Sequence, residues 1–91
     1  MRFVWDARKA AANARKHRVS FEEASTVFGD NLAITAADPD HSVAEERWIT
    51  FGESMHGRLL AVSHGEQEGD IIRIISARPA TRSERKLYEE G

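Results

Sequence analysis

Arginine side chains around an isoleucine-rich segment are the residues of this chain best suited to chemistry on an anion. Residues 70–78 read Asp-Ile-Ile-Arg-Ile-Ile-Ser-Ala-Arg, which places Arg73 inside the run and Arg78 at its end. A guanidinium keeps its charge and offers N–H donors in a planar fork that matches a phosphate. Arg73 and Arg78 are therefore candidates to hold a scissile phosphate and stabilise its growing negative charge. The alternative for Arg73 is an ion pair with Glu45 or Glu46.

Histidine and lysine residues at the ends of predicted elements are candidates for proton transfer. Lys16 and His17 close the first predicted helix, and His64 ends a predicted strand. Cleavage of RNA through its ribose 2′-hydroxyl needs groups that exchange protons near neutral pH, as histidine does. The alternative for each histidine is a surface or capping role. The histidines and acids match no compact metal motif and cysteine is absent, so the sequence predicts no metal site and no cofactor.

Three residues near the carboxy terminus and one in the middle of the chain are further candidates for RNA binding. Arg82, Arg85 and Tyr88 belong to the last predicted helix, whose amino terminus also favours anions. Arg47 is the only cation among residues 21–57, which carry eight acids, so an ion pair is its default interpretation. For Tyr88 the alternative to stacking on a base is packing against the protein.

The strand that carries Arg73 is predicted to end at or before Arg78, because Pro79 has no N–H to donate to a neighbouring strand. Its β-branched composition favours burial on at least one face. Simple alternation puts Arg73 on the same face as Ile75 and puts Ser76 on the other face. We expect Arg73 to project from the face that the helices leave open.

Three helices are predicted from capping residues and helical spacing. Asp6 is a good N-cap for a helix to about Lys16, and the apolar face of that helix consists of alanines. Two capping boxes, Ser20 with Glu23 and Thr81 with Glu84, begin the helices predicted over residues 20–28 and from residue 82.

The remaining strands are predicted over residues 2–5, 32–37, 47–51 and 59–64. The resulting order is β-α-α-β-β-β-β-α. Consecutive strands joined by short turns predict an antiparallel meander sheet with helices packed on one face. The expected fold class is thus α+β, a two-layer sandwich, and residues 1–91 form a single domain.

Charge is distributed unevenly along the chain. Residues 1–20 carry six Lys and Arg and one acid, and residues 71–88 are basic as well, so the two ends form a basic surface if they meet in space. The alternative is that these charges solvate two helices. No apolar run approaches the ~20 residues that span a bilayer, so we expect no membrane contact. A cytoplasmic location is expected, which the lack of cysteine fits.

Several blocks of the sequence together resemble a known family. The opening Phe3-Val4-Trp5-Asp6 is followed by Lys9, Asn13 and Lys16-His17, and the middle contains Glu45-Glu46-Arg47-Trp48. The most specific blocks are Arg73-Ile74-Ile75-Ser76-Ala77-Arg78, Ala80-Thr81, Glu84-Arg85 and Tyr88. This pattern is similar to BrnT, the toxin family of the BrnT/BrnA type II toxin–antitoxin system, over nearly the whole chain.

The resemblance implies a small RelE-like α+β endoribonuclease toxin that cleaves RNA without metal and inhibits translation. It also implies neutralisation by a BrnA-like antitoxin with a ribbon-helix-helix part, through which alone the toxin contacts operator DNA. A different class of function remains as the alternative, namely a non-catalytic binding module that scaffolds the DNA-binding antitoxin for autoregulation of the operon.

Overall fold

The computed structural model describes residues 1–38, 46–66 and 69–91, and its elements follow the predicted order. The strands are β1 (Arg2–Val4), β2 (Ile34–Ala37), β3 (Trp48–Glu53), β4 (Leu59–Glu66) and β5 (Ile71–Pro79). The helices are α1 (Ala7–His17), α2 (Phe21–Ser25), the 3₁₀ helix η1 (Thr26–Gly29) and α3 (Arg82–Glu90). The predicted α+β class is confirmed. Within the described ranges, no helix is both long and apolar enough to cross a membrane.

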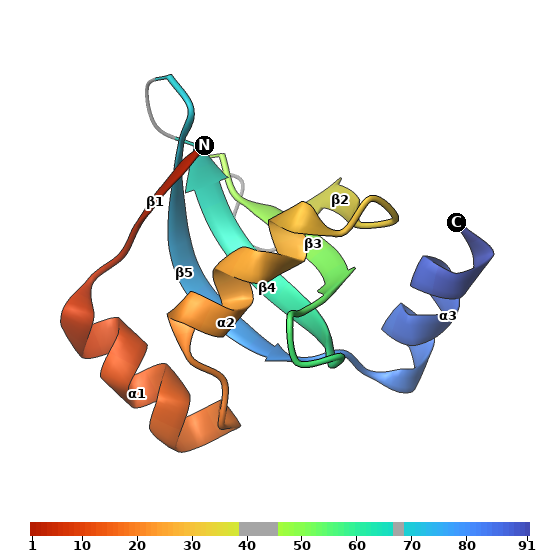
Figure 1. The fold of residues 1–91 in the computed structure, drawn as a ribbon, viewed down its shortest axis with the longest axis horizontal. Helices are drawn as coiled ribbons and strands as arrows, with labels where there is room; N and C mark the ends of the chain where they lie inside the picture. Colours follow the sequence, from red (N-terminus) through yellow and green to blue (C-terminus); the bar gives the residue numbers. More distant parts are fainter. Residues whose placement is uncertain (39–45, 67–68) are drawn as a thin grey trace.

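The five strands form one sheet in the order β1-β5-β4-β3-β2. Strands β2 to β5 make the predicted antiparallel meander. Strand β1 pairs in parallel with β5, with Arg2 opposite Ile71 and Val4 opposite Arg73, so the sheet is mixed rather than wholly antiparallel. The chain therefore brings its first strand beside its last one (Figure 1). Strand β5 also includes Pro79, one residue beyond the predicted end, at the end of the ladder where proline is tolerated.

One face of the sheet packs against the helical layer formed by α2 and η1. Figure 1 shows α2 crossing the sheet, with α1 beside β5. Aromatic rings extend this contact, because Phe3 of β1 lies 5.3 Å from Phe28 of η1, measured between ring centroids. The buried core combines apolar residues of both layers, namely Val19, Phe21, Ala24, Val27, Leu60, Val62, Ile74 and Ala77.

The helix predicted over residues 20–28 is divided into α2 and η1. The Ser20 hydroxyl accepts from the Glu23 N–H at 3.0 Å, as the predicted capping box requires. The Glu23 carboxylate, only 5% exposed, instead accepts from the Ser54 hydroxyl at 2.7 Å and from the Arg58 guanidinium. The Arg58 hydrogen bond holds the pKa of Glu23 below its ordinary value. This ion pair fastens α2 to the turn between β3 and β4.

Helix α3 is attached by polar contacts rather than by burial. The capping box of Thr81 and Glu84 is present as predicted, and none of the residues of α3 is buried. The helix lies against β3, and the Tyr88 hydroxyl donates to Asp30 at 2.6 Å. In Figure 1, α3 lies on the side of the molecule away from α1.

Candidate functional site

A β-bulge at Ile75 interrupts the pairing of β5 with β4. Arg73 pairs with Gly65, and the next regular pair on the same face joins Ser76 to Ser63. Three steps along β5 thus match two along β4, and Ile75 is the extra residue of a bulge. The face of β5 that points away from α2 consequently carries Arg73 and Ser76.

The bulge places both candidate arginines on one face of the sheet. Arg73 and Arg78 are five residues apart, so in a regular strand they would point to opposite faces. Instead, Arg78 pairs with Ala61, which alternates along β4 with Ser63 and Gly65. The prediction that Arg73 lies on the face away from the helices agrees with this register. The prediction that Arg73 shares its face with Ile75 and not with Ser76 is wrong, because the bulge reverses the alternation.

The Arg73 side chain lies over a glycine of the neighbouring strand. Its Nη2 is 3.5 Å from the position that a Cβ would take at Gly65, and the main-chain oxygen of Glu46 is 3.6 Å from that position. The guanidinium therefore lies across β4, close to the backbone that precedes β3. Glu45, one of the two ion-pair partners predicted for Arg73, lies outside the described residues.

The Arg78 guanidinium is engaged by α3. Its Nη1 and Nη2 donate to the two carboxylate oxygens of Glu84 at 2.7 and 2.9 Å. This contact raises the pKa of Arg78 and, with the backbone N–H of Thr81, lowers the pKa of Glu84 to about 2. The residues of β4 that pair with Arg78 and with Arg73 are four positions apart, which is roughly 13 Å at ~3.3 Å per residue. In this conformation the two guanidiniums do not share one ligand.

Asn13 holds α1 against the edge of β5. Its amide nitrogen donates to the carbonyls of Val19 and Ala77 at 2.9 and 2.8 Å, and its amide oxygen accepts from the Ala77 N–H at 3.0 Å. Strand β1 pairs with β5 only as far as Arg73. Asn13 therefore supplies, beyond β1, the hydrogen bonds that another strand would give to Ala77.

A groove of about 220 Å³ opens between α1 and this edge of β5. It brings the predicted proton-transfer residues Lys16 and His17 beside the bulge, which lies between Arg73 and Arg78 along the chain. Among the described residues that line it there are two lysines and no acid, so the groove favours an anion. We call it the α1–β5 groove; its lining residues are Lys9, Ala12, Asn13, Lys16, His17, Ile75 and Ser76.

His64 lies away from the α1–β5 groove, on β4, with its side chain buried between the sheet and the helical layer. It is 3% exposed, its Nε2 is 2.7 Å from the Thr50 hydroxyl, and its ring centroid is 4.9 Å from that of Phe28. Burial lowers the pKa of His64 to about 4. These surroundings do not support the predicted role in proton transfer to RNA.

The candidates for RNA binding outside β5 are dispersed. Arg82 and Arg85 are exposed on α3, and Arg47 immediately precedes β3, where its carbonyl accepts from the Asp38 N–H at 2.9 Å. The Tyr88 hydroxyl is bound to Asp30, which raises its pKa to about 12. Tyr88 thus has the structural role given above as its alternative, and none of these four residues lines the α1–β5 groove.

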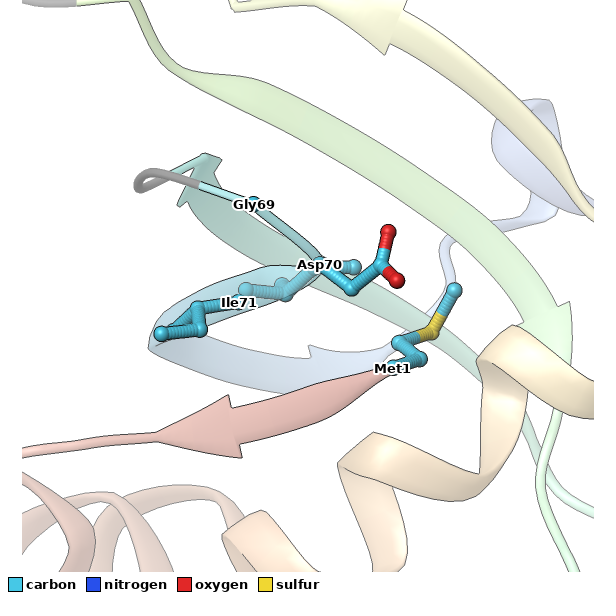
Figure 2. A pocket seen from close by; sticks show the side chains of 5 residues that line it. Met1, Gly69, Asp70 and Ile71 are labelled. Carbon is cyan, nitrogen blue, oxygen red and sulfur yellow. The ribbon is translucent and has the colours of Figure 1, made fainter.

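A second hollow, of about 300 Å³, lies at the start of β1 and β5 and offers little to an anion. Figure 2 shows the Asp70 carboxylate at this hollow together with Met1 and Ile71. Elsewhere, no group of three histidine, aspartate or glutamate side chains in the described part of the chain is arranged to hold a metal ion.

Three polar residues that line the α1–β5 groove, Lys9, Asn13 and Ser76, were not selected from the sequence as site residues. Lys9 and Asn13 form one stripe along a helix with Lys16, which was selected, at spacings of four and three residues, and that spacing was the available signal. Ser76 had no comparable signal, because its face depends on the bulge.

Comparison with known proteins gives a family and a fold. The model of the family described as "Ribonuclease toxin, BrnT, of type II toxin-antitoxin system" matches residues 5–84. The crystal structure of the Brucella abortus ribonuclease toxin BrnT aligns with a TM-score of 0.66 and 23% sequence identity, covering 90% of this chain and 99% of that chain. At that identity the alignment shows a shared fold. None of the curated proteins matches the chain.

Proposed function

Because this chain belongs to the BrnT family of ribonuclease toxins of type II toxin–antitoxin systems, we propose that it cleaves RNA without metal along the outer edge of β5. The observation that carries the proposal is the α1–β5 groove, where Lys16 and His17 meet the segment between Arg73 and Arg78. The proposed consequence in the cell is inhibition of translation. A cytoplasmic location follows from the substrate.

In the proposed reaction, the ribose 2′-oxygen attacks the neighbouring phosphorus and the bond to the 5′-oxygen of the next nucleotide breaks. One of Lys16 and His17 takes part in moving the proton from the 2′-hydroxyl to the departing oxygen. The products are a 2′,3′-cyclic phosphate and a 5′-hydroxyl. Arg73 and Arg78 bind the RNA backbone at different points along β5, and the arginine nearer the scissile phosphate stabilises its charge.

The proposed partner is a BrnA-like ribbon-helix-helix antitoxin, and the toxin contacts operator DNA only through it. The family name supports an antitoxin partner in general. The proposal that this antitoxin is of the BrnA-like ribbon-helix-helix type is supported by the sequence resemblance given above. Arg82, Arg85 and Arg47 remain candidates for peripheral contact with RNA, because arginine outside the cleavage site still attracts phosphate.

The test is purified protein incubated with RNA in EDTA, with the ends of the products identified. We expect cleavage, with cyclic phosphate ends, and a loss of about 100-fold or more in rate for Arg73→Ala. Arg8→Ala, which removes the same charge from an exposed position of α1, is the control and should cleave normally. RNA that stays intact in EDTA, together with tight binding to the antitoxin, would instead support the non-catalytic binding module.

A further inference from the structure

We infer that a groove between α3 and the turn before β2 is where the antitoxin docks, through a segment that combines apolar anchors with Lys or Arg. This inference rests on the proposed function, since it names the site of the partner that the toxin family implies. The groove has a volume of about 430 Å³ and lies apart from the α1–β5 groove. Its lining residues are Thr26, Gly29, Asp30, Leu32, Glu53, Ser54, Met55 and Tyr88. We call it the α3 groove.

Exposed apolar side chains are concentrated at the α3 groove. Four large apolar residues in the described part of the chain are highly exposed, and Leu32 and Met55, at 69% each, both line this groove. A third, Leu87, is 57% exposed and directly precedes Tyr88 in α3. Exposed apolar residues gathered around a concavity indicate a protein–protein contact, and methionine is enriched in such contacts.

The floor of the α3 groove is built from groups that already have hydrogen-bond partners. The Asp30 carboxylate accepts from the N–H groups of Leu32 and Glu53 and from the Tyr88 hydroxyl. The Thr26 hydroxyl accepts from the Met55 N–H at 2.8 Å. Because the floor is fixed before a partner arrives, binding there costs little ordering of the toxin, which favours affinity.

The charge of the α3 groove indicates which kind of partner can bind there. The lining residues include the carboxylates of Asp30 and Glu53 and neither lysine nor arginine. RNA is repelled by this combination, and a second copy of the toxin would bring the same carboxylates toward one another. A segment with Lys or Arg beside an apolar anchor is complementary to it. The volume of the α3 groove is near the lower end of the range for ligand pockets, so the groove can accommodate a few anchoring side chains of a partner.

The test measures binding of the purified antitoxin, taken as the product of the reading frame next to the toxin gene, to the intact toxin. We expect Leu32→Ser combined with Met55→Ser to weaken binding by about 30-fold or more, as truncation of interface anchors does. Glu53→Lys should weaken binding further, and the effect should shrink at high salt. Ala11→Ser, at an exposed position of α1 that lines neither groove, is the control and should bind normally.

Growth arrest and RNA cleavage separate this inference from the proposed function. The double variant should keep both activities and a normal melting temperature while escaping rescue by the antitoxin. Normal rescue of the double variant would overturn the inference. A toxin dimer that the double variant loses would also overturn it, since the occupant would then be a second copy. If the wild-type protein neither arrests growth nor cuts RNA yet binds the antitoxin here, the proposed function fails and the inference stands.

Discussion

His64 shows how the position of a residue changes its chemistry. Its imidazole contacts Thr50 of the sheet and Phe28 of the helical layer, and burial lowers its pKa from 6.5 to about 4. As the pH falls from about 6.5 to about 4, the unfolded chain takes up a proton at His64 while the folded chain does not. The folded state therefore loses up to about 3 kcal/mol of stability over this range.

Chemical denaturation measured between pH 7 and pH 4 checks this expectation. His64→Gln removes the titrating group and keeps an amide that can bond to Thr50. The variant should show a much flatter decline of unfolding free energy across this range. A wild-type protein whose stability is constant from pH 6.5 to pH 4 would contradict the placement of His64. The acids with lowered pKa values, such as Glu84 at about 2, add their own losses at lower pH.

Two elements, β5 and α3, show what was predictable from sequence and what was not. The capping residues and the isoleucine run determine local structure, so α1, α3 and most of β5 were predicted closely. The bulge at Ile75 depends on register against β4, which is set by packing across the sheet. The burial of Asn13 was not predicted for a similar reason, because the hydrogen bond that holds its side chain goes to a residue 64 positions away in the sequence.

Helix α3 competes with RNA for Arg78. Both carboxylate oxygens of Glu84 accept hydrogen bonds from the Arg78 guanidinium, in the bidentate geometry with which an arginine also binds a phosphate. Glu84→Gln keeps a residue that suits the capping box and removes the charge that competes with RNA. We expect the affinity for a 2′-O-methyl RNA, which cannot be cleaved, to rise on the order of fivefold, or about 1 kcal/mol. Fluorescence anisotropy would measure it. An affinity that falls as far as in Arg78→Ala would mean that Glu84 positions the arginine instead.

At the scale of the whole molecule, the chain separates its charges onto different surfaces. The basic α1–β5 groove and the carboxylate-lined α3 groove have no lining residue in common. Neither groove was visible from the uneven charge of the sequence alone, because the carboxy-terminal basic residues are divided between β5 and α3. In the two proposals made above, the basic groove takes nucleic acid and the carboxylate-lined groove takes protein.

Salt dependence should reveal which cations contact phosphate. Each lysine that neutralises a phosphate of single-stranded RNA steepens the dependence of log affinity on log salt by about 0.7. We expect Lys9→Ala and Lys16→Ala each to reduce the slope by about this amount, because both residues line the α1–β5 groove. Arg8→Ala, from an exposed position outside that groove, should leave the slope unchanged. Equal slopes for all three variants would contradict RNA binding in the groove.

The parallel pairing of β1 with β5 has a consequence for protein synthesis. Arg2 is made early, but it can pair only after Ile71, 69 positions later in the sequence, has been made. The bulge residue is made later still. Until the ribosome has made β5, neither the edge of this strand nor its arginines exist, so the proposed cleavage site cannot assemble on a shorter nascent chain. The proposed site therefore cannot act on RNA at the ribosome before strand β5 has been translated and has paired with β1.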